Sequence, residues 1–289
     1  MERNIRDSQN FLHDKKLVSS LVENSNINNT DIVYEIGPGK GIITEHLLRV
    51  SKSVIAIELD TSLYQFLKQN LNSEKLTLIN QDFMNIKLPD GNYKVFSNIP
   101  FNMTGEILTR LLTAINPPQD MYIIMQYEAM LKYAGTPYYK DTLKSLMFKP
   151  LYDIKLAYEF LPSDFKPKPN VSIVLVHFHK KEYCDIKKAT MLEYWDFLSY
   201  MYTAPGLNFK QKTKNIFSYE QQKRLKKIIN LDSELNFSDW TYIQWIKMFD
   251  TYKQFVCQDK KKLVEGSYQK LLKEQSKLEK VHRSRTQRY

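Results

Sequence analysis

The chain has 289 residues, which is enough for two domains with a core each. Its hydrophobic content of 43% is that of an ordinary globular protein, and no apolar run approaches the ~18 residues that a membrane helix needs. The start lacks the apolar stretch of a secretory signal, and two cysteines are too few for a disulfide framework or a zinc site. We therefore expect a reducing, cytoplasmic compartment and no membrane partner.

The chain is basic, with 42 Lys and Arg against 32 Asp and Glu and a net charge of +10. It is also rich in aromatic residues, with 19 Tyr and 15 Phe. This combination favours a polyanion partner whose bases stack on aromatic rings. The same charge can equally serve solubility alone, so composition leaves both interpretations open.

In chain order, a short amphipathic helix is expected at residues 14–24, followed by strands that alternate with helices. The strands are expected at 31–36, 54–57, 76–79, 93–97 and 121–125, and the helices after residue 41, at 61–71 and at 104–113. Such alternation is typical of βαβ units around a parallel sheet. Two late strands, at 154–160 and 171–178, are joined by a proline-rich segment. The pattern predicts an α/β, Rossmann-like domain over residues 1–178.

From residue 179 onward the pattern is helical, with breaks near 205–206 and 230–233. It predicts a small all-helical domain over residues 179–258. Residues 259–289 form a basic tail in which ten Lys and Arg face four Asp and Glu. With few large apolar residues, this tail is either a solvated helix or disordered.

Three of the eight glycines, Gly37, Gly39 and Gly41, lie between a predicted strand and a predicted helix. Glycine there lets the backbone turn sharply and approach a ligand at the helix N-terminus. The spacing differs from the G-x-G-x-x-G dinucleotide motif, yet a glycine loop between strand and helix still indicates a nucleoside-type cofactor. The alternative is a tight turn with no ligand.

Acidic residues follow the next two strands. Glu58 ends the second strand, where a carboxylate can accept both hydroxyl hydrogens of a ribose. Asp82 follows the third strand and can accept from an adenine amine, with Phe83 adding a backbone N–H and apolar contact. Each acid alone could be a helix cap or a solvated turn residue, but their order after the glycine loop favours the cofactor interpretation.

The segment Asn98-Ile99-Pro100-Phe101 suits methylation of a purine amine, whose lone pair is delocalised into the ring. A carboxamide oxygen and a backbone carbonyl can accept the amine protons and localise that lone pair. Proline holds the turn rigid, and a phenylalanine ring offers a stacking face. The alternative is a strand end followed by a simple proline turn.

Taken together, these segments resemble the ribosomal RNA adenine N6-dimethyltransferases, the Erm/KsgA family. The resemblance rests on six segments in order: Asn10-Phe11-Leu12, Glu35-x-Gly37-x-Gly39-x-Gly41, Glu58, Gln81-Asp82, Asn98-Ile99-Pro100-Phe101 and Phe165-x-Pro167-x-Pro169-x-Val171. It covers residues 4–178, with weaker similarity to about residue 256. It implies S-adenosyl-L-methionine as cofactor, rRNA as partner and a monomer.

The resemblance also implies roles for single residues. Asn98 and the Ile99 carbonyl would hold the target amine, Pro100 would fix the turn, Phe101 would stack on one face of a flipped adenine, and Phe165 would cover the other face. The cofactor pocket would be lined by Asn10, Leu12, Gly37, Gly39, Glu58, Asp82, Phe83 and Asn98. The cofactor already activates its methyl group, so no general base is nominated. No metal is implied.

Some positions depart from the family pattern or leave alternatives. Ile173 stands where a serine is usual, and Phe101 replaces the commoner tyrosine. Glu128 either lies near the target base or caps a helix. Lys210, Lys212 and Lys214 either contact phosphate or form a solvated helix face.

Two branches of the family differ in target. The Erm branch modifies an adenine of 23S rRNA and confers macrolide, lincosamide and streptogramin B resistance, whereas the KsgA branch modifies two adjacent small-subunit adenines. The short segment before Ser8, Ser8 in place of glycine and Ile99 in place of leucine favour the Erm branch. A nucleic-acid-binding factor without activity stays open as a different class, although the intact pocket residues disfavour it.

Overall fold

The computed structural model describes residues 10–206, 208–230 and 239–277, and divides the chain into two compact units. The first unit holds the chain up to Ala134 together with Leu151–Tyr183, and the second holds Gly135–Pro150 and the chain from Cys184. The expected division at residue 178 lies close to the last of the three points at which the chain passes between the units, after Tyr183. Residues 135–150, which the sequence assigned to the first domain, group with the later helices.

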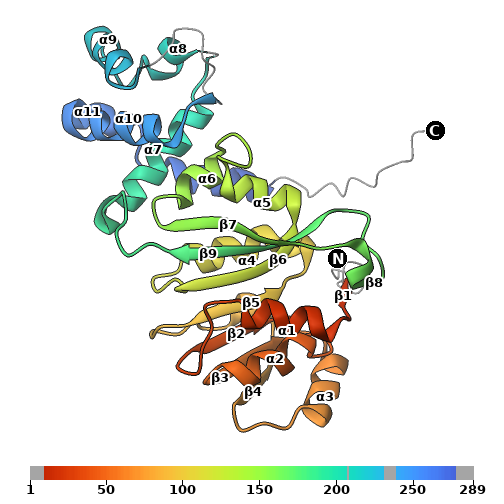
Figure 1. Ribbon diagram of the computed structural model, residues 1–289. Coiled ribbons are helices and arrows are strands. Elements are labelled where there is room, and N and C mark those ends of the chain that lie inside the picture. Colours follow the sequence, from red (N-terminus) through yellow and green to blue (C-terminus); the bar gives the residue numbers. More distant parts are fainter. Residues whose placement is uncertain (1–9, 207, 231–238, 278–289) are drawn as a thin grey trace. The chain divides into compact units, whose positions relative to one another are not determined.

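A seven-stranded sheet forms the centre of the first unit, with the order β4-β3-β2-β5-β6-β9-β7 (Figure 1). Its strands are β2 (Ile32–Ile36), β3 (Ser53–Glu58), β4 (Leu76–Asn80), β5 (Lys94–Asn98), β6 (Asp120–Gln126), β7 (Tyr152–Glu159) and β9 (Ile173–Lys180). The five strands from β2 to β6 run parallel, and β9 pairs antiparallel with both β6 and β7. The strands expected from the sequence are all present, but the sheet is mixed because β9 runs opposite to its two neighbours, β6 and β7.

Helices alternate with the strands as predicted. They are α1 (Lys15–Glu23), α2 (Ile42–Val50), α3 (Thr61–Asn70), α4 (Thr104–Leu112) and α5 (Tyr127–Ala134). Of these, α2, α3 and α4 each connect two successive parallel strands, whereas α1 precedes β2 and α5 follows β6. Asp14 starts α1 by accepting hydrogen bonds from the backbone N–H groups of Lys16 and Leu17, which would otherwise lack partners. Residues along β6 are buried almost throughout, as expected for a strand whose two faces are both covered.

A second, two-stranded sheet was not expected from the sequence. In it β1 (Phe11–Leu12) pairs antiparallel with β8 (Phe165–Lys166), so that Leu12 lies opposite Phe165. This pairing ties the N-terminal segment to the proline-rich loop between β7 and β9, which lies far along the chain. Two-residue strands carry almost no periodicity, so no sequence pattern marks them.

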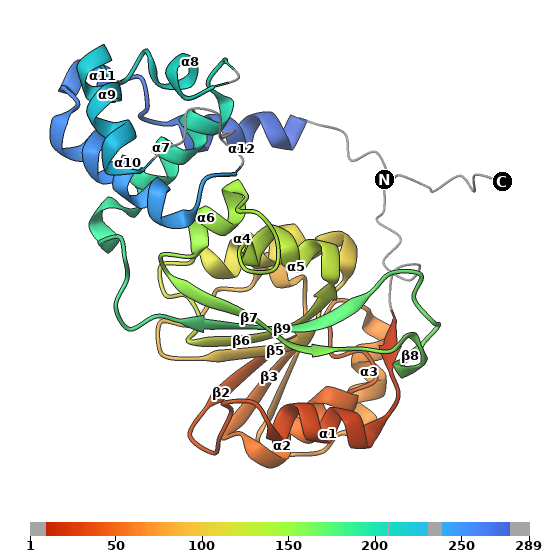
Figure 2. The same cartoon turned by 45° about the horizontal axis from the view of Figure 1, so that its top comes forward.

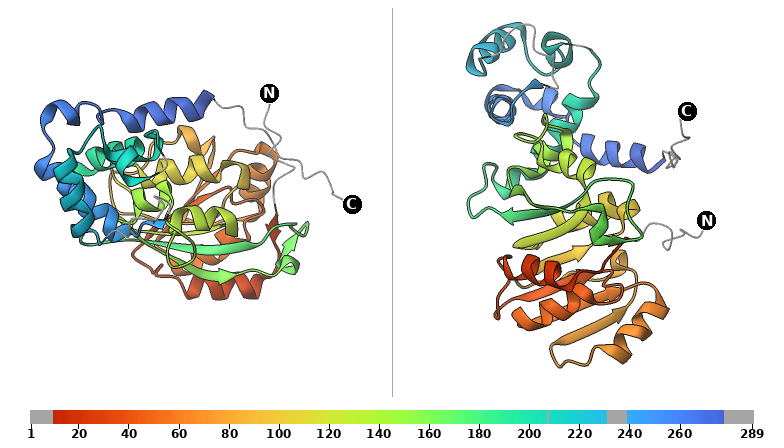
Figure 3. Two further views of the ribbon diagram at one scale, coloured as in Figure 1. Left: turned by 90° about the horizontal axis from the view of Figure 1, so that it is seen from above. Right: turned by 45° about the vertical axis from the view of Figure 1, so that its right-hand side comes forward.

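The second unit is helical, as predicted (Figure 3). Its helices are α6 (Leu143–Phe148), α7 (Met191–Thr203), α8 (Phe209–Thr213), α9 (Tyr219–Ile228), α10 (Tyr242–Phe255), α11 (Gln258–Lys261) and α12 (Ser267–Lys277). Aromatic rings fill its core: Phe197 packs against Tyr252 with ring centroids 4.8 Å apart, and Tyr194 packs against Phe249 at 5.0 Å. None of the described helices in either unit has the length and apolar content to cross a membrane.

The described part of the basic tail is helical and anchored to α7 (Figure 2). Asp196 of α7 accepts hydrogen bonds from the backbone N–H groups of Gly266 and Tyr268, at 3.0 and 2.9 Å. Tyr268 is 5% exposed and lies 5.4 Å from the Trp195 ring. Of the two alternatives for this tail, the helical one therefore holds as far as Lys277, and residues 278–289 lie outside the described part.

The turn between β2 and α2 requires glycine at its last position. Gly41 has a φ of +82°, which side-chain-bearing residues rarely adopt. A Cβ atom there would also lie 2.7 Å from Leu67 Cδ2 and 2.8 Å from Leu71 Cδ1. By contrast, Gly105 lies exposed on α4, and a Cβ atom at that position would have no neighbouring atom within 4 Å.

We therefore expect Gly41→Ala to lower the free energy of unfolding by about 1–3 kcal/mol, because it adds backbone strain and a steric clash. Gly105→Ala is the matched control and should raise it by up to about 1 kcal/mol, since alanine favours a helix. Urea unfolding followed by circular dichroism measures both. Equal effects of the two substitutions would contradict this account of the turn.

Candidate active site

Residues at the carboxyl ends of neighbouring parallel strands form the candidate site. Ile36 ends β2, Glu58 ends β3 and Asn98 ends β5. Strand β2 lies between β3 and β5, so the sheet order reverses direction beside it. A crevice outside the carboxyl ends at such a reversal is where open α/β sheets bind their ligands.

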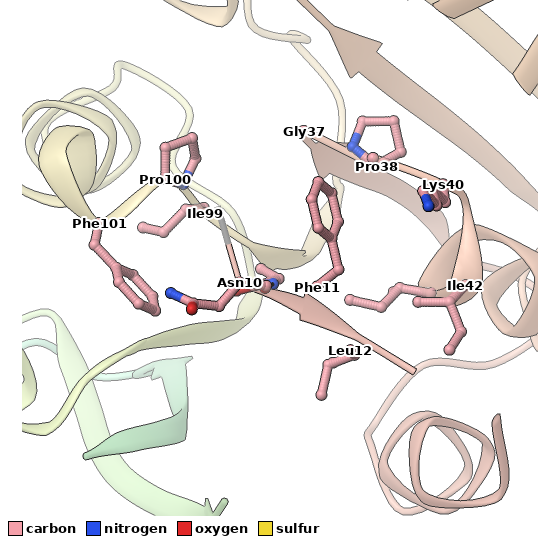
Figure 4. Close-up of a pocket in the computed structure, with 13 residues that line it drawn as sticks. Asn10, Phe11, Leu12, Gly37, Pro38, Lys40, Ile42, Ile99, Pro100 and Phe101 are labelled. Atoms are coloured by element: carbon pink, nitrogen blue, oxygen red, sulfur yellow. The ribbon is translucent and has the colours of Figure 1, made fainter. Parts of the chain in front are cut away.

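The first cavity at this position is bounded by three segments that are distant in sequence (Figure 4). They are the N-terminal segment, the glycine loop and the turn after β5. The lining residues are Asn10, Phe11, Leu12, Gly37, Pro38, Gly39, Lys40, Ile42, Ile43, Asn98, Ile99, Pro100 and Phe101. Of the predicted site residues, this cavity brings together Asn10, Leu12, Gly37, Gly39 and the whole Asn98–Phe101 segment.

A second cavity adjoins the first, since Gly37 and Pro100 line both. It contains the predicted acids Glu58 and Asp82 within mainly apolar walls. Its lining residues are Ile36, Gly37, Ile57, Glu58, Leu59, Gln81, Asp82, Phe83, Pro100, Met103 and Ile107. An apolar slot with two carboxylates matches a nucleoside, whose base is flat and whose hydroxyl and amine groups donate hydrogen bonds.

Glu58 is held in place by the backbone around it. Its Oε2 accepts from the Gly39 N–H at 3.1 Å and its Oε1 accepts from the Asp60 N–H at 2.9 Å. Burial raises the pKa of Glu58, and these hydrogen bonds act against that rise. Each carboxylate oxygen can accept two hydrogen bonds, so both keep capacity for a ribose hydroxyl.

Asp82 is oriented by its role as a cap. Its Oδ1 accepts from the Met84 N–H at 2.8 Å and starts the short 3₁₀ helix Phe83–Asn85. The helix-cap alternative from the sequence is thus present in the structure. It does not exclude the cofactor role, because Asp82 and Phe83 both line the second cavity.

The amide of Asn98 has a defined orientation. Its Nδ2 donates to the Asn10 carbonyl oxygen at 2.9 Å. The opposite orientation would place two oxygens against each other, so the hydrogen bond identifies which atom is which. The amide Oδ1 is therefore the atom that Asn98 can offer to an amine in the cavity.

The turn that follows carries the other predicted residues of the segment. Ile99 is buried, and the Pro100 carbonyl accepts from the Met103 N–H at 2.9 Å, which starts the 3₁₀ helix Phe101–Met103. The ring of Phe101 lies on the wall of the first cavity, beside Asn10 (Figure 4). An amide acceptor and an aromatic face thus occupy one side of this cavity.

Phe11 is a lining residue to which the sequence analysis assigned no role. A Cβ atom on Gly39 would lie 2.9 Å from Phe11 Cε1, so a glycine at this position lets the ring approach the loop. The ring lies close to Gly37 and Pro38 in Figure 4. Its place between Asn10 and Leu12, both predicted site residues, was the available signal.

Phe165 differs from the other predicted residues. Its side chain is 1% exposed, lies 5.2 Å from the Phe160 ring, and belongs to the hydrophobic core that includes Leu12. It borders a hollow of the 160–173 loop and not the cavity that contains Phe101. Phe165 and Phe101 thus line different cavities, although Phe101 packs against the same hydrophobic cluster, and the predicted clamp stays a prediction.

The remaining predicted residues lie elsewhere. Glu128 is in the first turn of α5, which suits the helix-cap alternative. Lys212 Nζ donates to the Ala204 carbonyl at 2.9 Å at the end of α7, so this lysine makes a contact within the protein. Lys210 and Lys214 are exposed.

Glu35 is a buried acid that the sequence analysis quoted only as part of a motif. It is 1% exposed, and its Oε2 accepts from Thr44 Oγ1 at 2.7 Å. Burial raises the pKa of Glu35 to about 8; the Thr44 hydrogen bond opposes this, and the nearby charge of Glu58 adds to it. Glu35 therefore favours the protonated form at neutral pH, which lowers the negative charge at the base of the glycine loop.

Comparison with known proteins decides the family. Residues 1–254 match the profile of the family described as Ribosomal RNA adenine dimethylase. The chain belongs to this family. As a ribosomal RNA adenine dimethylase it is an rRNA adenine N6-methyltransferase, and S-adenosyl-L-methionine is its methyl donor. The two adjoining cavities, with Glu58 and Asp82 in one and the glycine loop in both, fit that donor.

Similar dimethylase sequences and structures support the assignment. The chain is 30% identical over 244 residues to an rRNA adenine N-6-methyltransferase of Bacteroides fragilis, covering 83% of this chain and 90% of that protein. It is 31% identical over 272 residues to one of Enterococcus faecalis, covering 88% and 98%.

Among solved structures, the 23S rRNA methyltransferase ErmE aligns with a TM-score of 0.74 at 20% identity, covering 85% of this chain and all of ErmE. A dimethyladenosine transferase from Plasmodium falciparum aligns at 0.68 and 18%, covering 84% of this chain and 97% of that one. These alignments confirm the Rossmann-like α/β fold with a helical second domain.

The raised pKa of Glu35 predicts a pH-dependent stability. Its folded-state pKa lies above the unfolded value of 4.5, so the folded state keeps a proton that the unfolded state releases. The stability that Glu35 contributes is full below pH 4.5 and is lost as the pH rises through about 8. Relative to Glu35→Gln, the wild type should lose on the order of a few kcal/mol between these limits.

Urea unfolding at several pH values compares the wild type, Glu35→Gln and the control Glu74→Gln, which changes an exposed acid. The difference between the wild type and Glu35→Gln should change steadily with pH, in favour of the variant at alkaline pH. The Glu74 variant should follow the wild type. If the Glu35 variant also ran parallel to the wild type, Glu35 would be ionised in the folded protein.

Proposed function

We propose that this protein methylates N6 of a specific adenine in 23S rRNA and thereby confers resistance to macrolide, lincosamide and streptogramin B antibiotics. One observation carries the chemistry: Asn98 offers its Oδ1, with Phe101 beside it, where the two cavities meet at Pro100. Ile99 supports the 23S target, and the relatives at 30 and 31% identity, which are named rRNA adenine N-6-methyltransferases, support the reaction. Ser8, which also favours this branch, lies outside the described residues.

The proposed mechanism begins with the target amine. Asn98 Oδ1 and the Ile99 carbonyl accept its two protons, which localises the nitrogen lone pair and aims it along one direction. Phe101 stacks on the base after it leaves the rRNA helix, because the amine cannot be reached within a stack. When bound, the donor supplies a methyl group on a sulfonium, so the protein has only to position the two reactants.

The second cavity is proposed to position the donor. Glu58 accepts from the ribose hydroxyls and Asp82 accepts from the adenine amine, with Phe83 packing nearby. Asn10, Leu12, Gly37 and Gly39 line the first cavity and would contact the remainder of the donor.

Other features of the proposal rest on the sequence. The second unit would bind RNA, with exposed Lys210 and Lys214 as candidate phosphate contacts. Phe165 would complete the base clamp. A monomeric state and a cytoplasmic location stay predictions.

The proposed role of Asn98 predicts a loss of rate that is larger than any loss of donor binding, because Asn98 also lines the cofactor cavity. Asn98→Ala removes the acceptor for the amine, so methyl transfer should fall by about 10²-fold or more. Asn70→Ala, a change of the same kind on the exposed surface of α3, should keep the wild-type rate. Transfer from labelled S-adenosyl-L-methionine measures the rate, and calorimetry measures donor binding. Full activity of Asn98→Ala would refute this mechanism.

The target is tested by offering two substrates to the same enzyme. Labelled S-adenosyl-L-methionine should transfer methyl to protein-free 23S rRNA, and Asn98→Ala serves as the inactive control. Transfer to assembled 30S subunits instead would replace the 23S proposal with the small-subunit alternative. RNA binding without transfer to either substrate would favour the non-catalytic binding factor.

A further inference from the structure

Two histidines and an aspartate meet at the edge of the sheet opposite the candidate active site. Asp120 is the first residue of β6, and His179 lies directly opposite it on antiparallel β9. His177 lies two residues earlier on β9, so it projects from the same face as His179. No metal was expected from the sequence, but His-x-His on a strand places two possible ligands on one face.

The three side chains converge on one another. His177 Nε2 and His179 Nδ1 each lie 2.8 Å from Asp120 Oδ1. One ligand atom from each residue falls within 4.8 Å of the other two. Two imidazole nitrogens and one carboxylate oxygen are the donor set of many three-residue zinc sites.

Aromatic packing holds the His177 ring in place. The His177 ring stacks on Tyr122 with centroids 4.3 Å apart and an angle of 6° between the planes. Tyr122 in turn stacks on Phe96 and accepts a hydrogen bond from the Asn26 N–H at 2.8 Å. Support of this kind fixes the ring orientation before a metal binds.

A metal ion could reach these residues from solvent on the side of His179. The side chain of Asp120 is 6% exposed and that of His177 is 18%, whereas that of His179 is 49%. An ion bonded at about 2.0–2.2 Å to each ligand needs them slightly further apart than hydrogen-bond distance. His179, at the open side, can supply that movement.

The local charge also favours a divalent cation. Lys94 Nζ lies 3.0 Å from Asp31 and 3.6 Å from Asp120 Oδ2, so one cation serves two carboxylates. With both imidazoles neutral, these three charged groups sum to −1. Lys94 approaches Oδ2 and both histidines approach Oδ1, so the lysine lies on the other oxygen of Asp120.

We propose that His177, His179 and Asp120 form a binding site for a divalent transition-metal ion of the zinc class, with water as the fourth ligand. Its ligands join β6 to β9, the strand pair through which β9 and β7 attach to the parallel strands. Binding stabilises the folded first unit. The site lies away from the methyl-transfer residues, so the inference is independent of the proposed function.

The test uses Zn²⁺ and Co²⁺ salts with the full-length, metal-stripped protein. Calorimetry should give one Zn²⁺ per chain, Co²⁺ should show the visible absorption of a four-coordinate ion, and Zn²⁺ should raise the melting temperature. His179→Gln should weaken binding by about 10-fold or more. Because His179 is half exposed, this variant is expected to fold, which circular dichroism checks.

His282→Gln is the matched control, because it removes a histidine of the basic tail and leaves the three proposed ligands intact. Wild-type affinity in this control, together with the loss in His179→Gln, supports the site. Unsaturable binding by the wild type, undiminished binding by His179→Gln, or an equal loss in the His282 variant would each overturn the proposal.

Discussion

The hydrogen bond from Asn98 Nδ2 to the Asn10 carbonyl joins the end of a central strand to the N-terminal segment. It has two consequences for the site. It brings Asn10, Phe11 and Leu12 over the glycine loop, so that a crevice at the sheet edge becomes a cavity with three walls. It also commits the amide nitrogen, so that the amide oxygen is the atom left for the proposed contact with the target amine. One hydrogen bond thus both places the N-terminal segment and orients the Asn98 amide, as expected where a site is preorganised.

The electrostatics of the glycine loop follow from burial. Two carboxyl groups, Glu35 and Glu58, lie within each other's field at the base of this loop. Backbone N–H groups of Gly39 and Asp60 stabilise the charge on Glu58, whereas Glu35 has a hydroxyl partner and a pKa of about 8. One acid is therefore suited to accept hydrogen bonds from a ligand, and the other supports the strand as a neutral group.

At the amino ends of the parallel strands, a buried carboxylate is stabilised by ion pairs and hydrogen bonds with side chains. There Asp120 contacts two histidines and a lysine. Burial alone would raise the pKa of Asp120. Its hydrogen bonds with His177 and His179 and the charge of Lys94 outweigh burial and hold the pKa of Asp120 well below its usual range. The parallel strands therefore have the candidate active site at their carboxyl ends and an ionic cluster at the other ends. The second unit adds helices around an aromatic core, and α12 extends it beyond the residues that match the family profile.

Most of the fold could be predicted from the sequence, because its signals are local. Alternating apolar runs identified every strand of the large sheet, and the order of Gly37, Glu58, Asp82 and Asn98 placed the site at the strand ends. What the tertiary structure decided depends on contacts between distant segments. These include the antiparallel direction of β9, the pairing of Leu12 with Phe165 that keeps this phenylalanine in the core, and the raised pKa of Glu35. Strand direction, burial and the convergence of His177 with Asp120 are set by which segments meet in space, and residue order along the chain does not contain that information.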